Sequence, residues 1–146
     1  MPASAVLPQS ALNEMAVDFL QGQTCRAMLL ADTYTPNRDG HTTRDDVQPH
    51  EVTGTGYVAG GEIVTPTVAR DDGSDRIRIT FPGHTWDNST ITAAYAAYYF
   101  QIGPAATDDP LIYVVDFDAA NDGPFSSNNS PFILLSHTQD LNNTTT

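Results

Sequence analysis

The sequence predicts a mainly β protein: an antiparallel β-sandwich, jelly-roll-like, with one N-terminal α-helix and a single domain over residues 1–146. Three observations predict this class. Short runs rich in β-branched and aromatic residues recur along the chain, turn-forming Gly, Pro, Asn and Asp residues separate them, and one helical pattern lies near the N-terminus. A chain of this length can bury an ordinary core without disulfides or metals.

The helix is expected over about residues 11–21, where apolar residues recur with helical spacing. Ser10 is in place to cap its start and Gly22 to end it in the left-handed conformation. The stripe that would face a sheet comprises Leu12, Met15, Ala16, Phe19 and Leu20.

A first buried strand is expected over residues 26–31, followed by a long polar loop over residues 32–56 with a short helical turn near 43–48. Loops of this length in compact domains are usually functional or form interfaces. Further strands are predicted thereafter, at residues 57–58, 63–68, 76–81, 90–102, 111–117 and 132–135.

The detail of these later strands follows from local pattern. Residues 71–74 form a hairpin turn, and Ile77, Ile79 and Phe81 alternate with outward polar residues. Residues 90–102 are ambiguous, since alanines favour helix and tyrosines favour strand. The nearly continuous apolar run 111–117 predicts a central strand that is covered on both faces.

Charge is the strongest compositional feature. The chain has 18 acidic and 6 basic residues, all six of them arginine, and a net charge of −12. Such a surface repels nucleic acid and anionic membranes, so neither is expected as a partner. The absence of lysine, with many Asp and Thr, is typical of a halophilic host or of a GC-rich genome. No apolar run approaches the ~20 residues of a membrane span, and the N-terminal residues do not resemble a secretory signal.

Several residue groups could carry chemistry, and each has a simpler explanation. Four glycines resemble a phosphate-binding loop but lack its spacing, and positive-φ turns explain them better: Gly54, Gly56, Gly60 and Gly61. Four oxygen-bearing residues could hold Ca²⁺ or form an Asx turn: Asp116, Asp118, Asn121 and Asp122. Four loop residues could bind a metal or lie solvated: His41, Asp45, Asp46 and His50. Four aromatic residues could form a sugar platform or a core: Trp86, Tyr95, Tyr98 and Tyr99.

No local pattern for a catalytic triad or a paired-carboxylate glycosidase occurs, so no catalytic, cofactor or metal residue is predicted and no enzyme activity is expected. The single cysteine, Cys25, starts an apolar strand and is interpreted as a buried, inert thiol.

Three segments carry a resemblance to a known family. The first begins with Tyr-Thr-Pro at 34–36, continues through a His and Asp45-Asp46, and ends with Glu-Val-Thr-Gly-Thr-Gly-Tyr and Gly60-Gly61. The second is the region around Trp86, residues 84–96, and the third is residues 110–117. Over about residues 15–136 the chain resembles a family of small virion structural proteins of tailed viruses, infecting bacteria or haloarchaea. The resemblance implies a strand within residues 90–102.

The resemblance also implies a non-enzymatic role in the virion, with assembly in the host cytoplasm. The first expectation is a capsid decoration or cement protein that binds the outer coat lattice, with the major capsid protein or other virion proteins as partners and a homo-oligomer, favoured as a trimer. The alternatives are a low-copy neck, tail or fibre-base protein and a receptor- or glycan-binding module. The 32–56 loop is expected to contact other subunits, with residues 37–46 dispensable for folding.

Overall fold

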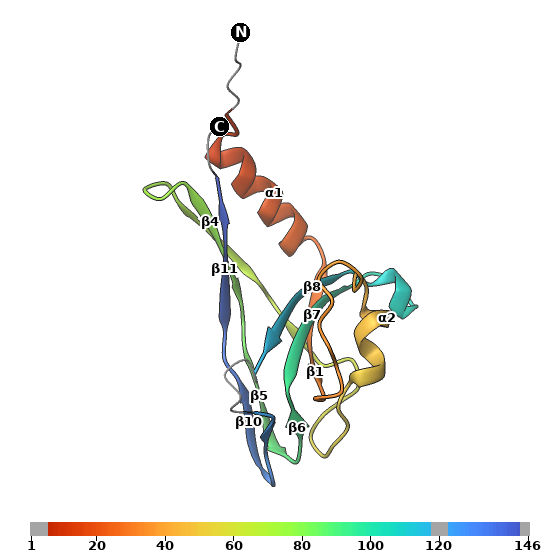
Figure 1. Ribbon diagram of the computed structural model, residues 1–146. Coiled ribbons are helices and arrows are strands. Elements are labelled where there is room, and N and C mark those ends of the chain that lie inside the picture. The colour runs from red at the N-terminus through yellow and green to blue at the C-terminus, as the bar shows by residue number, and fades with distance from the viewer. Residues whose placement is uncertain (1–5, 118–122, 144–146) are drawn as a thin grey trace.

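The structure is a computed structural model that describes residues 6–117 and 123–143. Its helices are α1 (Gln9–Gln21) and α2 (Arg44–Val47), with 3₁₀ turns at Gln48–His50 and Ala106–Asp108. Its strands are β1 (Thr24–Leu30), β2 (Glu62–Val64), β3 (Thr67–Asp71), β4 (Arg76–Phe81), β5 (His84–Ser89), β6 (Thr92–Ala93), β7 (Tyr95–Gln101), β8 (Leu111–Asp116), β9 (Phe125–Ser126), β10 (Ser130–Leu134) and β11 (His137–Asn142). The predicted mainly β, antiparallel fold with an N-terminal helix is confirmed (Figure 1).

The first layer is a four-stranded antiparallel sheet in the order β2-β1-β7-β8. Strand β1 pairs along its whole length with β7, with Ala27 opposite Tyr98. Small residues on β7 let the neighbouring layers approach closely, since Ala96 and Ala97 are completely buried on its opposite faces.

The second layer is made of two long bent ribbons. Strands β4 and β5 follow one another through Pro82 and Gly83, and β10 and β11 follow one another through residues 135–136, so β5 pairs with β10 and β4 with β11. Strand β3 completes the outer end beside β4. A Cβ at Gly83 would collide with the carbonyl oxygen of Leu134, so the bend allows only glycine.

The main core lies between the two layers. Its largest side chains come from both sheets, and the rings of Phe81 and Tyr113 stack with centroids 4.3 Å apart. The main buried residues are Leu20, Cys25, Ala27, Leu29, Val52, Val64, Ile79, Phe81, Trp86, Ile91, Ala96, Tyr98, Phe100, Val115, Phe132 and Leu134. The inward positions predicted for Ile77, Ile79 and Phe81 are confirmed, as all three are buried.

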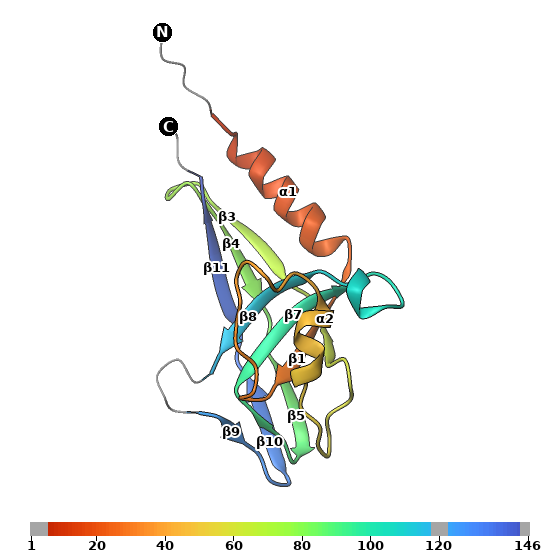
Figure 2. The same cartoon turned by 45° about the vertical axis from the view of Figure 1, so that its right-hand side comes forward.

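Helix α1 covers the outer end of the second layer, against β3 and β4 (Figures 1 and 2). Ala16 and Leu20 are buried, whereas Met15 and Phe19 remain more than half exposed at 53% and 58%. The predicted stripe therefore faces the sheet only in part. The predicted caps are wrong: the chain enters the helix at Pro8, whose carbonyl accepts the first turn's bonds, and Gly22 lies in the right-handed region at φ −80°.

Two strand predictions are wrong in an informative way. Strand β8 is the edge of its sheet, although a central strand was predicted. Its apolar run reflects two covered faces, with Tyr113 and Val115 toward the main core and Val114 toward a second core. The last strand is β11, a polar segment for which no strand was predicted. Residues 57–58 lie between two turns and form no strand.

Within the described ranges, no helix has the length and apolar character needed to span a bilayer.

Candidate functional site

The long loop, residues 32–56, packs on the outer face of the first sheet (Figure 2). Tyr34 and Val47 from the loop are buried against Met28, Leu30 and Tyr99 of the sheet and form a second core. The Tyr34 ring lies edge-on to that of Tyr95, with centroids 5.2 Å apart. The loop is polar in composition, yet these apolar residues anchor it on the sheet.

A short helix fixes the middle of the loop. The predicted turn near 43–48 is confirmed as α2, whose start is capped by Asp46. The backbone N–H groups of Thr42 and Thr43 donate to Asp46 Oδ2 at 2.8 and 3.1 Å. These two bonds are the main reason that the pKa of Asp46 lies below its usual value. The sequence pattern Thr-x-x-Asp is thus a helix cap rather than a metal ligand set.

An ion pair ties the loop to the start of β8. Arg44 Nε donates to Asp109 Oδ2 at 2.8 Å, and the Asp109 side chain is completely buried. The other carboxylate oxygen accepts the N–H groups of Ile102 and Gly103 at 2.8 and 3.2 Å. Burial raises the pKa of Asp109, but these backbone bonds and Arg44 outweigh burial and hold it below the usual value. The Arg44 guanidinium also lies 5.2 Å from the Tyr99 ring centroid.

Since Arg44 lies within residues 37–46, deleting that segment would leave the Asp109 carboxylate buried without its cation. This contact argues against the expectation that residues 37–46 are dispensable for folding. Residues 37–40 form an uninterrupted exposed tip of this segment.

The Glu-Val-Thr-Gly-Thr-Gly-Tyr motif, residues 51–57, forms a hydrogen-bonded cluster with Gly60 that holds the loop on the sheet, and we call this cluster the latch. Tyr57 donates its hydroxyl proton to Glu51 Oε2 at 2.6 Å, and Gly60 donates its N–H to the same oxygen at 2.7 Å. The Tyr57 oxygen in turn accepts the N–H of Leu29 at 3.1 Å, and Tyr99 donates to the Gly60 carbonyl at 2.6 Å. Burial, followed by the bond to Glu51, raises the pKa of Tyr57.

The glycines serve this latch. Gly56, Gly60 and Gly61 have positive φ angles of 82°, 94° and 77°, which confirms the turn interpretation for these three. Gly54 has no positive φ; a side chain there would collide with the Thr90 carbonyl. At Gly61 a Cβ would also collide with the Ala27 carbonyl of β1, so both the positive φ and this close approach require glycine.

The candidate metal residues of the loop are not brought together. His41 Nδ1 shares a hydrogen bond of 3.0 Å with the Tyr34 hydroxyl, and His50 Nδ1 shares one of 3.0 Å with Thr33 Oγ1. In the part of the chain that the structure describes, no three His, Cys, Asp or Glu side chains converge as a metal centre would require, Asp45 included. Of the calcium candidates, Asp118, Asn121 and Asp122 lie outside the described residues.

The aromatic platform expected for a glycan-binding module is contradicted. Trp86, Tyr98 and Tyr99 are 2%, 0% and 1% exposed, so no ring face is available to a sugar. Tyr95 is only partly exposed and packs on Tyr34. The Trp86 motif is a core feature, in contact with the rings of Tyr57, His84 and Phe132.

Cys25 is buried as predicted. Burial raises the pKa of its thiol to about 12, so the thiolate that would react is absent at neutral pH.

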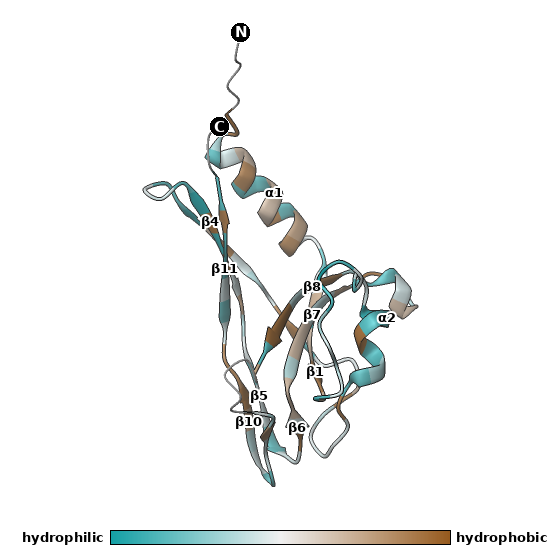
Figure 3. Ribbon diagram, viewed as in Figure 1, coloured by the Kyte–Doolittle hydropathy of each residue, from teal (hydrophilic) through white to brown (hydrophobic). Residues whose placement is uncertain are grey.

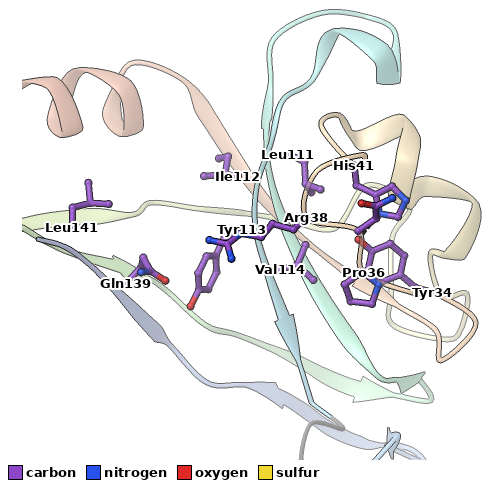
Figure 4. A pocket seen from close by; sticks show the side chains of 11 residues that line it. Tyr34, Pro36, Arg38, His41, Leu111, Ile112, Tyr113, Val114, Gln139 and Leu141 are labelled. Atoms are coloured by element: carbon purple, nitrogen blue, oxygen red, sulfur yellow. Dashed lines mark hydrogen bonds between the residues drawn. The ribbon is translucent and has the colours of Figure 1, made fainter.

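The open side of the molecule lies along the free edge of β8. Figure 4 shows Gln139 and Leu141 on one side of this strand and Tyr34, Pro36 and His41 on the other, with Arg38 reaching across it toward Tyr113. The groove has a volume of about 560 Å³. A second groove of about 390 Å³ continues past Asp116 to β10 and a third of about 240 Å³ separates β8 from α1.

Apolar residues line the second and third grooves, and the ribbon of β8 between them has the colour of strongly hydrophobic residues (Figure 3). The β9 and β10 region exposes Phe125, Ile133 and Leu135 at 46%, 60% and 70%. Beside them, His137 has a buried Nδ1 without a hydrogen-bond partner among the described residues. We refer to β8 with its three grooves as the open seam. Sequence reasoning missed this surface because it placed β8 at the centre of the sheet.

Compared with known proteins, the chain matches no family model, no curated protein sequence and no solved structure.

Proposed function

We propose that this protein is a non-enzymatic virion structural protein, and that it serves as a decoration or cement protein on the outer coat lattice of a tailed virus. The proposal begins from the sequence resemblance. One structural observation supports it: the residues of the most similar segment are used to hold a loop rigidly on a sandwich, and they converge on no reactive group.

A rigid scaffold with an apolar open seam suits a protein that works by docking. Glu51, Tyr57 and Asp109, which could otherwise serve as acids or bases, are engaged in bonds that fix the loop. Exposed apolar residues on α1, β9 and β10, among them Phe19, Phe125 and Ile133, can instead contact other subunits. Many modest contacts of this kind, repeated over a lattice, would stabilise a coat against internal pressure.

Such contacts would tolerate a salt-rich environment. Apolar and aromatic burial does not weaken with ionic strength, whereas surface ion pairs do. An acidic, lysine-free surface with apolar docking residues therefore fits a halophilic host.

The test is the copy number of this chain in purified virions, measured by quantitative mass spectrometry against the major coat protein. Hundreds of copies, in a fixed ratio to the coat protein, are expected for a decoration protein. A count of about a dozen, set by the closed symmetry of a neck or tail ring, would move the protein to that position. Absence from washed particles would refute the virion role.

A further inference from the structure

The free edge of β8 offers backbone hydrogen-bonding groups to a partner. Phe117 donates its N–H to Ala94, and the pairing continues with Val115 opposite Ala96 and Val114 opposite Ala97. In an antiparallel pair the bonded positions alternate, so Val115 bonds to β7 and Val114 points its N–H and C=O away from it. Neither group of Val114 has a hydrogen-bond partner elsewhere in the described chain.

The loop covers the start of this edge, where the Leu111 N–H donates to the Thr42 carbonyl, but beyond Leu111 the edge lacks the features that usually protect an edge strand. Residues 113–115 are Tyr-Val-Val, without charge, proline or glycine, and a bulge interrupts the pairing only before them, near Ile112. The edges β2, β3 and β11 are protected: β2 has only three residues, β3 lies under α1, and β11 carries Asp140 paired with Arg76 and Arg78. By contrast, β8 is an unprotected edge whose backbone groups are available for pairing with a partner strand.

Charge indicates what pairs with it. Among the residues that the structure describes, Asp116 is the one acidic residue that lines the three grooves of the open seam, together with Arg38, His41 and His137. Two copies that each carry −12 repel one another over most of their surface, and the seam is where that repulsion is smallest. Arg38 is also the arginine for which the described residues supply no hydrogen bond or ion pair, so its charge is available there.

We propose that two copies of this chain pair through their β8 edges, antiparallel and about a two-fold axis at Val114, into one continuous eight-stranded sheet. Val114 then bonds with Val114 of the second copy, and Tyr113 lies opposite Val115. Asp116 of the second copy lies opposite Ile112, on the face from which Arg38 reaches over β8. The symmetry forms this Arg38–Asp116 contact twice. This order is two-fold rather than the threefold expected from the resemblance, and it stands whether or not the virion role does.

Cross-linking tests the register directly. Paired residues that share hydrogen bonds have Cα atoms about 5.5 Å apart, a spacing that a disulfide can bridge. Val114→Cys should therefore form a covalent dimer under mild oxidation, while the buried Cys25 of the unaltered chain should not. Ile63→Cys, on the exposed opposite edge β2, is the matched control and should stay monomeric on a denaturing gel. Equal cross-linking of both variants would overturn the proposal.

Proline distinguishes pairing from folding. Val114→Pro removes an N–H that points to the partner, so the monomer should stay folded while dimerisation is lost. Val115→Pro removes a bond to β7 and should instead destabilise the fold. Arg38→Glu places like charges together and should weaken the dimer roughly tenfold without affecting the fold.

Light scattering with size exclusion, at up to about 100 μM protein, gives the mass of each variant. The unaltered chain should be a dimer. A monomer throughout this range, a trimer, or a dimer that persists in a folded Val114→Pro variant would each overturn the proposal. Because this measurement is made on the isolated protein, it can fail while the virion copy number succeeds, and the reverse.

Discussion

Removing the Asp109 carboxylate should unfold the loop layer and cost a large part of the stability of the domain. In Asp109→Ala the Arg44 guanidinium, 15% exposed, loses its counter-ion, and the N–H groups of Ile102 and Gly103 lose their acceptor. Breaking a buried ion pair on one side costs about 3–5 kcal/mol. We take about 3 kcal/mol, because Arg44 keeps some solvent and its contact with Tyr99.

Urea unfolding measures this loss. With a slope of about 2 kcal/mol per molar urea, the midpoint should fall by about 1.5 M. The neighbouring Asp108 is the matched control: it is exposed and accepts one bond, from the Ala105 N–H at 3.3 Å, so Asp108→Ala should cost under about 1 kcal/mol. If both variants lost the same small amount, the reasoning that the loop is anchored by a buried charge would be refuted.

The same pair sets a pH dependence. The folded pKa of Asp109 lies below its unfolded value, so its contribution is complete above the unfolded pKa of about 3.9 and is lost as pH falls through the folded pKa. The difference in stability between the unaltered chain and Asp109→Ala should therefore be constant near neutrality and shrink in acid. A difference that grew on acidification would contradict this sign.

Three further outcomes are expected. Tyr57→Phe leaves the Leu29 N–H without its acceptor and leaves Glu51 Oε2 with the Gly60 N–H as its remaining donor, and should lower the free energy of unfolding by about 2–3 kcal/mol in urea titrations; an unchanged midpoint would show that the latch is not formed. Gly61→Ala, which forces a Cβ onto the Ala27 carbonyl, should prevent β2 from pairing with β1 and reduce soluble yield; Gly73→Ala, at an open turn with no positive φ, should be tolerated. Raising NaCl from 0.1 to 1 M should raise the thermal midpoint, because salt screens the repulsion within a chain of net charge −12; a fall would argue that ion pairs dominate its stability.

The local sequence pattern was sufficient to predict those elements that the spacing of apolar residues identifies. The helical spacing of Ala16 and Leu20 predicted α1, and alternation from Ile77 to Phe81 predicted β4 with the correct face inward. The polar strand β11 was missed because its side chains are stabilised by partners across the sheet. One example is Asp140 with Arg78, which are 62 residues apart.

The candidate site depended on relations that one sequence does not contain. Asp109 and Arg44 are 65 residues apart, and nothing in either neighbourhood marks them as partners. The apolar run of β8 indicated two covered faces but not the position of the strand in the sheet, because faces and edges are separate properties of a strand. The long loop that follows β1 was a possible sign of the edge position of β8, because such a loop has to cover one face of the sheet.

The two ends of the described chain are joined at one corner. Asn143, just after β11, donates from Nδ2 to the Leu7 carbonyl at 2.9 Å and to Gln9 Oε1 at 3.2 Å, so the entry to α1 and the exit from β11 are neighbours (Figure 1). A short linker could therefore connect them, and the chain could be reopened at the exposed tip of residues 37–40 as a circular permutant. Cargo fused to either end of the described chain would leave from this same corner, away from the β9 and β10 end of the sandwich (Figure 2).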